Sequence, residues 1–281
     1  MNNFQAFILG LVEGLTEYLP VSSTGHLLVT QRLLGINSSN SADAFAICIQ
    51  VGAILAVLGL YRMRVWKMTL GMLGRDAEGR HLALSIILAF LPAAVIGLML
   101  EKTIKKYLFG GDEWGLWPVV AAWFFGGVAI LAVTIFRRMR GVTPRLGFEL
   151  EQITWRMAFL VGLIQCLAMW PGVSRSLLTI VGGLLVGLSV PAAVEFSFLL
   201  GVVTLTAATA YDGLKYGQEM LEHYGAVPLL IGLGAAWLSA VIAVKWMVGY
   251  LKSHGLEIFG WYRIAAAIVV AAWLLWPTMF K

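Results

Sequence analysis

Long runs of apolar residues alternate with short polar segments along the whole chain. A helix needs about 20 mostly apolar residues to cross a hydrocarbon core about 30 Å thick. The runs that are long enough cover residues 44–61, 82–100, 118–136, 192–211, 227–247 and 261–278. The pattern therefore predicts six transmembrane helices.

Two further apolar regions, 4–34 and 157–188, are each interrupted near the middle. The first breaks at Pro20 and the polar run 22–26, and the second breaks at Pro171 and the polar run 174–176. Each half has roughly 14 residues, which is too short to cross the bilayer. We expect each region to form a re-entrant helical hairpin that enters and leaves the membrane on one side.

The composition also favours a membrane protein. Hydrophobic residues make up 60% of the 281 positions and charged residues 12%, about half the charged fraction of an average soluble domain. We therefore predict an all-α polytopic membrane protein with a single membrane domain over residues 1–281. The N-terminus lacks the basic stretch and cleavage site of a signal peptide. Cys48 and Cys166 lie in apolar runs, where small buried side chains are expected rather than metal ligands.

The charged residues indicate an orientation. Basic residues flank the apolar runs instead of forming one patch, so nucleic acid is not an expected partner despite the net charge of +5. The positive-inside rule places the basic loops 62–81, 137–156 and 248–260 in the cytoplasm, with Arg263 as a flank of the third loop. Loops 101–117 and 212–226 then lie outside. The first of these carries Asp112 and Glu113, but also three residues that depart from the rule, namely Lys102, Lys105 and Lys106.

The two halves of the chain resemble each other. Residues 10–13 match residues 162–165, and Pro20 with the serines at 22–23 matches Pro171 with the serines at 174 and 176. Each half, about 1–140 and about 150–281, consists of one hairpin and three spans. Because the number of spans is odd, the halves have opposite orientations, which predicts an inverted repeat with its functional site where the two hairpin tips meet.

The first hairpin carries an acidic pair followed by hydroxyl groups. Glu13 and Glu17 are four residues apart and lie on one helix face. Two carboxylates inside a membrane need a cation, a proton or a basic partner, and hard divalent cations such as Mg²⁺ or Ca²⁺ suit them; a solvated helix end is the alternative. His26 shares a turn with Ser22, Ser23 and Thr24 and is a candidate acid/base or nucleophile, or else a helix-end donor.

The second hairpin carries a positive charge at the start of a helix. Free N–H groups there, together with Arg175, would bind a phosphate or another oxyanion. The alternative is a structural salt bridge from Arg175 to Glu13 or Glu17. Asp43 and Glu195 are expected to be ordinary acids at helix N-termini. The remaining candidates for the anion site are Ser174, Ser176, Thr179 and Gln165, where Gln165 either contributes to the site or bonds between helices.

Two segments carry a resemblance to a known family. Residues 13–26, which read EGLTEYLPVSSTGH, resemble the glutamate-rich motif of the bacterial undecaprenyl-diphosphate phosphatases, also called bacitracin-resistance proteins. Residues 171–176, PGVSRS, together with Thr179 resemble their second motif. Chain length, segment number and the stretch 50–57 also fit, so the resemblance covers nearly the whole chain.

The resemblance implies hydrolysis of undecaprenyl diphosphate to undecaprenyl phosphate and inorganic phosphate, which recycles the lipid carrier of cell-wall synthesis and confers bacitracin resistance. It also implies a divalent cation, and a site in the bacterial cytoplasmic membrane that opens to the outer side. Undecaprenyl diphosphate and membrane lipid are the expected partners, with a homodimer as a candidate assembly. The chain departs from the family pattern at Leu177, where glycine is usual, and at Ala46, where many members have an acid.

The motif residues are assigned roles as follows. Arg175 binds phosphate oxygens, Glu13 and Glu17 hold the cation, and catalysis involves Glu17 with Ser23 or His26, water being the third candidate nucleophile. The substrate-binding residues are Ser22, Thr24, Ser174, Ser176, Thr179 and Gln165. A lipid transporter or flippase is the alternative function, because inverted repeats and broken helices are common there. The acid phosphatase superfamily is excluded, because it requires a histidine several residues after its Ser-Arg segment. No histidine lies between His81 and His223, and so none follows Ser174 and Arg175 at that spacing.

Overall fold

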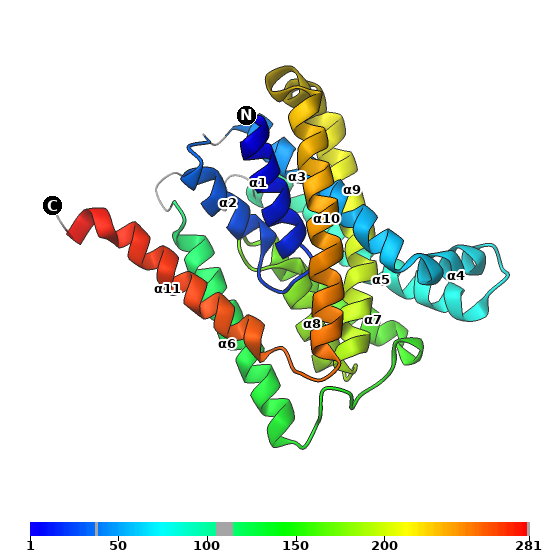
Figure 1. Ribbon diagram of the computed structural model, residues 1–281. Coiled ribbons are helices and arrows are strands. Elements are labelled where there is room, and N and C mark those ends of the chain that lie inside the picture. Colours follow the sequence, from blue (N-terminus) through cyan, green and yellow to red (C-terminus); the bar gives the residue numbers. More distant parts are fainter. Residues whose placement is uncertain (37–38, 105–114, 280–281) are drawn as a thin grey trace.

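The computed structural model describes residues 1–36, 39–104 and 115–279, and each regular element in this part is a helix (Figure 1). The first half contains α1 (Asn3–Thr16), α2 (Ser23–Leu33), α3 (Asn40–Leu60), α4 (Arg62–Met72), α5 (Ala77–Ile104) and α6 (Trp117–Met139). The second half contains η2 (Leu150–Gln152), α7 (Trp155–Gln165), η3 (Cys166–Met169), α8 (Arg175–Leu185), α9 (Val190–Tyr224), α10 (Ala226–Leu251) and α11 (Glu257–Met279).

The six predicted spans are confirmed, and the chain is a multi-pass membrane protein. Within the described residues, the helices long and apolar enough to cross a bilayer are Ser41–Leu60, Ala77–Met99, Trp117–Met139, Val190–Tyr224, Ala226–Leu251 and Glu257–Trp276. Each overlaps one of the apolar runs. The all-helical architecture follows because a helix satisfies its backbone hydrogen bonds internally, as the hydrocarbon core requires.

Two predicted loops are largely helical. The prediction of an outer loop over 212–226 is wrong. Helix α9 continues to Tyr224 and α10 begins at Ala226, with only Gly225 between them at a φ of 76°. Residues 214–224 are polar, but glycine at 217 is the only poor helix former among them, so polarity here marks an exposed helix rather than a loop. The loop 62–81 likewise contains α4 and the start of α5.

The expected outer loop 101–117 is described only at its two ends. Helix α5 continues through Ile104, so the first residues of the predicted loop are helical. The expectations for Lys105, Lys106, Asp112 and Glu113 lie outside the described residues.

Short helices replace the two interrupted apolar regions. Helices α1 and α2 have 14 and 11 residues, and α7 and α8 have 11 each. Helix α1 packs against α10 and α2, while α7 packs against α5 and α8, and α8 packs against α9. The connection between α1 and α2 is therefore mostly buried, whereas the connection between α7 and α8 is buried at Pro171 and Gly172 and exposed at Leu167 and Trp170.

Glycines allow α1 to approach α10 closely. A Cβ atom added to Gly10 would lie 2.3 Å from the Gly232 carbonyl oxygen, and one added to Gly14 would lie 2.1 Å from both the Ala236 carbonyl oxygen and the Ser239 hydroxyl. Small residues at such crossings are the usual basis of helix association in membranes. The position of α1 therefore depends on these glycines.

We expect Gly14→Ala to destabilise the protein by about 1–3 kcal/mol, because the added methyl group forces α1 away from α10. The thermal unfolding midpoint in detergent measures this loss. Gly234→Ala is the matched control: it lies in α10, and a Cβ there meets nothing within 4 Å. Alanine is the better helix former, so the control should not lower the midpoint; equal midpoints for the two variants would contradict the packing argument.

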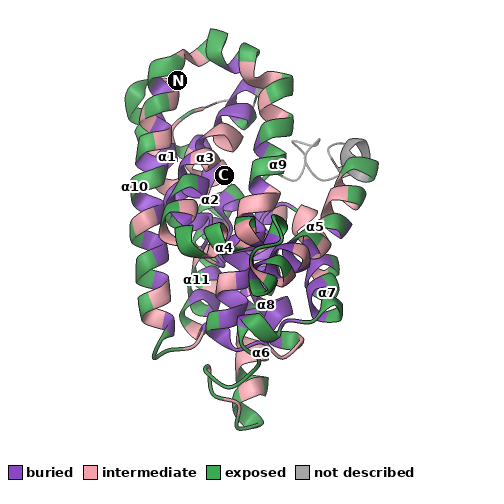
Figure 2. Cartoon of the chain, turned by 90° about the vertical axis from the view of Figure 1, so that its right-hand side faces the viewer, coloured by how far each residue is buried: buried purple, intermediate pink, exposed green. Residues whose placement is uncertain are grey.

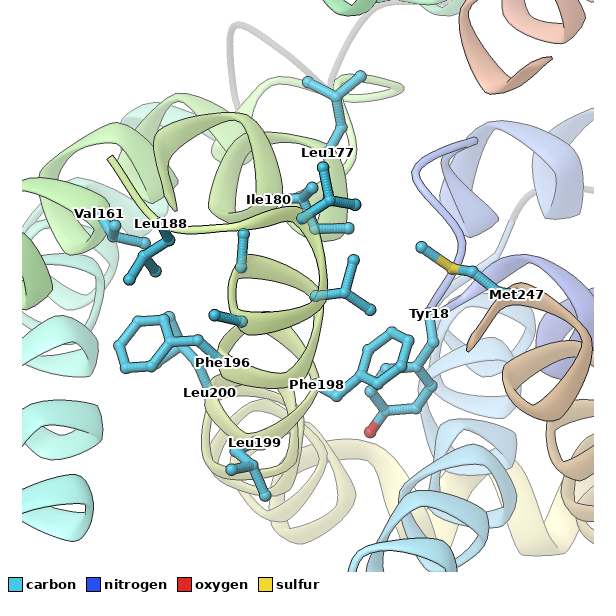
Figure 3. Close-up of a cluster of buried hydrophobic side chains, with 14 of the residues drawn as sticks. Tyr18, Val161, Leu177, Ile180, Leu188, Phe196, Phe198, Leu199, Leu200 and Met247 are labelled. Atoms are coloured by element: carbon cyan, nitrogen blue, oxygen red, sulfur yellow. The ribbon is translucent and has the colours of Figure 1, made fainter. Parts of the chain in front are cut away.

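The largest buried cluster joins the two halves of the chain. Tyr18 from the first half packs edge-to-face on Phe198 of α9, with ring centroids 5.4 Å apart (Figure 3). Figure 2 shows buried residues concentrated in the interior, and exposed residues along the outer faces of the long helices. Large apolar side chains are exposed there, for example Phe125 and Ile242, as expected for surfaces that contact lipid.

The two cysteines differ slightly from expectation. Both are free and partly exposed rather than fully buried. The Cys166 thiol, at the start of η3, donates a hydrogen bond at 3.3 Å to the carbonyl oxygen of Gly162 in the preceding helix α7.

Candidate active site

The connection between α1 and α2 meets the connection between α7 and α8. We name residues 17–23 the first tip and residues 166–175 the second tip. The Ser176 hydroxyl, one residue past the second tip, donates to the Leu19 carbonyl oxygen at 2.7 Å. Arg175 Nη2 lies 3.0 Å from Glu17 Oε1. The sequence predicted that the two polar motifs come together, and these contacts confirm it.

Both tips end in the same unusual backbone conformation. Ser22 has a φ of 75° and Ser174 a φ of 81°, and they are the only non-glycine residues with positive φ in the described chain. Each serine caps the helix that follows, accepting a hydrogen bond from the N–H of Gly25 or Leu177. Such backbone costs about 1–3 kcal/mol per residue and is concentrated at functional sites.

Glu17 connects a hydroxyl group to a guanidinium group. Its Oε2 atom accepts a hydrogen bond from Ser23 Oγ, and its Oε1 atom accepts one from Arg175. The side chains of Glu17 and Arg175 are 6% and 11% exposed. A hydroxyl bonded to a buried carboxylate is the arrangement of a nucleophile with its base, and the guanidinium holds that carboxylate in place.

Helix α9 supports Arg175. Arg175 Nη1 donates to the Ser197 carbonyl oxygen at 3.1 Å, and a Cβ atom on Gly201 would lie only 2.2 Å from this nitrogen. The guanidinium carbon lies 5.4 Å from the centre of the Tyr18 ring. Because the Nε–H has no partner among the described residues, Arg175 retains the capacity to donate to an anion.

A small polar cavity lies between the tips. Its volume is about 130 Å³, and Ser23, Glu17 and Arg175 all line it. Ser22 and Thr24 add hydroxyl groups from the first helix pair, and Ser174 adds one from the second. The other lining residues are Gln50, Ala168, Met169, Trp170, Pro171, Gly172 and Leu205. The cavity therefore offers hydroxyl donors and one cation, which suits a small oxyanion.

His26 lies beside this cavity and does not line it. Its Nδ1 atom is 2.7 Å from the Ser22 carbonyl oxygen, and its Nε2 atom is 2.7 Å from the Tyr262 hydroxyl. The ring is stacked on Tyr262, and the ring of Trp123 lies 4.5 Å away. With both ring nitrogens engaged, His26 holds the Ser22 turn rather than facing a substrate.

Glu13 lies in the interior beside Glu17 and within reach of the charge of Arg175. It is completely buried, and neither carboxylate oxygen has a hydrogen-bond partner in the described residues. The charges of Glu17 and Arg175 act on it. No group of three or more His, Cys, Asp or Glu residues gathers in the part of the chain that the structure describes. A hard cation fits here only if Glu13 and Glu17 bind it together with hydroxyl or water oxygens.

Comparison with known proteins identifies the family. The family described as bacitracin resistance protein BacA matches residues 6–269. The chain belongs to this family. A curated relative named undecaprenyl-diphosphatase from Sorangium cellulosum is 46% identical over 273 residues, covering 96% of this chain and 86% of its own length. The undecaprenyl-diphosphatase of Aquifex aeolicus is 42% identical over 275 residues, covering 98% and 100%.

Three residues expected to bind substrate in this BacA-family chain lie away from the cavity. Thr179 is fully buried and bonds to the Arg175 carbonyl and, at 2.6 Å, to the Ser197 hydroxyl. Ser176 bonds to the Leu19 carbonyl and to Ser174. The Gln165 amide is buried without a partner in the described residues and does not line the cavity. Thr179 and Ser176 therefore hold the second tip in place.

Glu195 is not the helix N-terminal acid that the sequence suggested. Helix α9 begins at Val190 and has no acidic residue in its first turn, whereas Asp43 does lie in the first turn of α3. Glu195 Oε1 instead pairs with Arg64 Nε at 2.6 Å, and Arg64 also pairs with Glu151 at 2.7 Å. A hydrogen bond from the backbone N–H of Glu151, together with Arg64, lowers the pKa of the Glu151 carboxyl.

Arg263 was missed because its charge was assigned to the flank of a loop, although it lies inside the predicted span 261–278. Helix α11 begins at Glu257, and Arg263 is completely buried. Nothing in the sequence motifs pointed to Tyr262 or Ser197, which contact His26 and Arg175. An arginine inside an apolar segment was the available signal.

The two departures from the family pattern lie outside the cavity. Leu177 is 2% exposed and belongs to the large core cluster, and its N–H is the donor that Ser174 caps. Ala46 is half-buried and packs with the small cluster around Phe45 and Ile49. Neither departure from the family pattern therefore changes a polar group of the two tips.

Proposed function

We propose that this chain hydrolyses undecaprenyl diphosphate to undecaprenyl phosphate and inorganic phosphate, and so recycles the lipid carrier of cell-wall synthesis and confers bacitracin resistance. The observation that carries the proposal is the contact of Ser23 and Arg175 with the two oxygens of Glu17, across two tips that are far apart in the sequence. The names of the curated relatives and the family match support it.

The chemistry of the substrate explains why charges are kept inside a membrane protein. Burying Glu13, Glu17 and Arg175 within apolar helices is costly unless a ligand or partner compensates them. A diphosphate that carries a long lipid tail needs an anion site at membrane depth, because its tail stays in the bilayer. Arg175 and the serine hydroxyls at the tips supply that site.

The geometry favours Ser23 as the nucleophile. Ser23 Oγ attacks the terminal phosphorus while its proton passes to Glu17. The bond from this phosphorus to the bridging oxygen breaks, and undecaprenyl phosphate leaves with the electron pair and takes the proton from Glu17. Water then attacks the phosphoserine, and Glu17 passes the proton of that water to Ser23 Oγ as inorganic phosphate leaves. Arg175 stabilises the charge that develops on the phosphoryl oxygens.

His26 is a poorer nucleophile candidate in this arrangement. Its Nδ1 and Nε2 atoms are each 2.7 Å from a partner that is not substrate. Water activated directly by Glu17 would use the same cavity and the same base. The two remaining mechanisms therefore differ only in whether a phosphoryl group is ever bonded to Ser23.

Glu13 and Glu17 would hold a divalent cation, Mg²⁺ or Ca²⁺. Such an ion would neutralise negative charge on the diphosphate. The support is the buried Glu13 carboxylate, whose two oxygens have no partner in the described chain. Both oxygens of Glu17 are already engaged, so Glu13 would be the principal ligand.

We expect a chelator to abolish phosphate release and added Mg²⁺ or Ca²⁺ to restore it. Glu13→Gln should raise the cation concentration needed for half-maximal activity at least about 10-fold, because one anionic ligand is lost. Titration of activity against free cation measures this. Ser85→Ala is the control, since its hydroxyl is also buried without a partner among the described residues but belongs to α5. An unchanged titration for Glu13→Gln would sink the cation assignment.

We further propose that α1–α2 and α7–α8 are re-entrant hairpins of an inverted repeat, with the site open to the outer side. The matching positive φ of Ser22 and Ser174 supports the repeat. Helices α6 and α11 also cross at Gly127 and Gly260, the third spans of the two halves. The basic α6–α7 and α10–α11 connections lie at one end of the molecule and the α9–α10 turn at the other (Figure 1), which suits the positive-inside rule.

The direct test uses the purified protein in detergent with farnesyl diphosphate and a divalent cation. We expect release of inorganic phosphate that increases with time and protein concentration. A lipid transporter built on the same scaffold would release none. Absence of phosphate release from protein with a normal unfolding transition would therefore favour the transporter.

A further inference from the structure

Arg263 of α11 is a buried cation whose hydrogen bonds within the described residues all go to backbone carbonyls. Its Nη2 atom donates to the carbonyl oxygens of Ala122 at 2.7 Å and Gly172 at 3.1 Å. Its Nη1 and Nε atoms donate to Pro20 and Trp123, each at 3.4 Å. Within the described residues it forms no ion pair with a carboxylate, although it is 0% exposed.

Two of these carbonyls occupy equivalent positions in the two tips. Pro20 lies two residues before Ser22, and Gly172 lies two residues before Ser174. Ser22 and Ser174 are the residues whose positive φ turns the chain into the next helix. One guanidinium therefore binds both tips at the same point relative to their strained turns.

The surroundings of Arg263 repeat those of Arg175. Arg175 donates to the carbonyl of Ser197 and lies over Gly201, four residues later in α9. Arg263 donates to the carbonyl of Ala122 and lies over Gly126, four residues later in α6, where an added Cβ would be 2.4 Å from Nη2. In each case a helical glycine leaves the space that the guanidinium fills.

We propose that Arg263 is a positioning residue that fixes the distance between the two tips and so aligns Ser23 and Glu17 with Arg175. The proposal rests on the proposed phosphatase activity. A planar guanidinium is suited to this task, because its five donors can reach carbonyls from several segments at once, whereas a lysine presents a single point. A buried unpaired cation is otherwise costly in a membrane protein.

The test is the kinetics of Arg263→Met and Arg263→Lys in phosphate release. We expect Arg263→Met to lower kcat about 10- to 100-fold with KM changed less than threefold, since misalignment of catalytic groups slows the chemical step. Arg263→Lys should recover only part of the loss. Arg137→Met is the matched control: it removes an arginine of α6 that also donates to two backbone carbonyls, those of Leu184 and Leu146. It should reduce stability and leave kcat unchanged.

A second variant keeps the proposal testable if Arg263→Met does not fold. Gly126→Ala displaces the guanidinium without removing it, so it should lower kcat by a smaller factor. In the double variant the two effects should not multiply, because both act through one contact. A kcat within twofold of wild type for Arg263→Lys and Gly126→Ala would overturn the proposal. A lowered kcat for the destabilised Arg137→Met variant would also overturn it, because loss of stability alone would then explain the lower kcat of the Arg263 variants. An inactive wild type would instead refute the proposed function.

Discussion

Arg175→Met is expected to lower kcat/KM for phosphate release by about 10³-fold or more. An arginine that neutralises a phosphoryl group in its transition state contributes on this order. The substitution also leaves the buried Glu17 carboxylate without its cationic partner. Both effects act on the reacting centre, so kcat should fall as well as substrate affinity. Steady-state kinetics with farnesyl diphosphate measure both parameters.

Two further variants serve as controls. Arg175→Lys tests whether the positive charge alone is enough, and Arg64→Met tests whether the loss of an ion pair outside the tips lowers activity. Lysine keeps the charge but loses the forked donor geometry, so this variant should recover only a minor part of the activity. Arg64 forms ion pairs with Glu195 and Glu151 at comparable distances but lies outside the tips. Arg64→Met should therefore retain activity within a few fold. Near-wild-type kinetics for folded Arg175→Met would contradict the assignment of Arg175 to the phosphate.

The second large effect is expected for Ser23→Ala. If Ser23 Oγ is the nucleophile, its removal should lower kcat at least about 10³-fold while substrate still binds. Quenching wild-type protein during turnover of a diphosphate labelled at its terminal phosphate should yield label on the peptide that contains Ser23. Ser23→Ala protein should carry none.

His26→Gln provides the contrast for this experiment. An acid/base residue contributes about 10²–10⁴-fold, whereas His26 holds the Ser22 carbonyl and Tyr262. We therefore expect a loss of about 10-fold or less. A labelled His26, or a Ser23→Ala variant that keeps most of its activity, would shift the mechanism to histidine or to water.

Much of the architecture could be predicted because the bilayer imposes strong rules on sequence. A span such as Trp117–Met139 requires an uninterrupted apolar run, and each candidate span within the described residues overlaps such a run. The same rule makes Glu17 and Arg175 conspicuous, since charges at membrane depth are rare. A salt bridge from Arg175 to Glu13 or Glu17 was the alternative interpretation of the second motif, and Arg175 does pair with Glu17.

What could not be predicted depends on packing between distant segments. The end of α9 is rich in polar residues, and polarity alone predicts a loop, whereas the helix-forming residues there allow the helix to continue to Tyr224. The pairing of Glu195 with Arg64 joins residues that are 131 positions apart. Arg263 binds carbonyls of both tips and of α6, and backbone carbonyls leave no mark in a sequence.

The positions of Ser176 and Thr179 also could not be predicted from the motif. Hydroxyl residues near an arginine suggest an anion site, but a helix turns successive side chains in different directions. Ser174 faces the cavity, while Ser176 and Thr179 face the first tip and α9. The motif therefore combines residues that line the site with residues that hold it in place.

The most direct test of the account is a comparison of wild-type and Glu17→Gln protein in phosphate release from undecaprenyl diphosphate. The amide keeps the shape of the side chain but cannot take the Ser23 proton, and it leaves the charge of Arg175 free for the substrate. We predict that kcat falls at least about 10³-fold while substrate binding is unchanged or tighter. A folded Glu17→Gln protein that releases phosphate at the wild-type rate would contradict the proposed site.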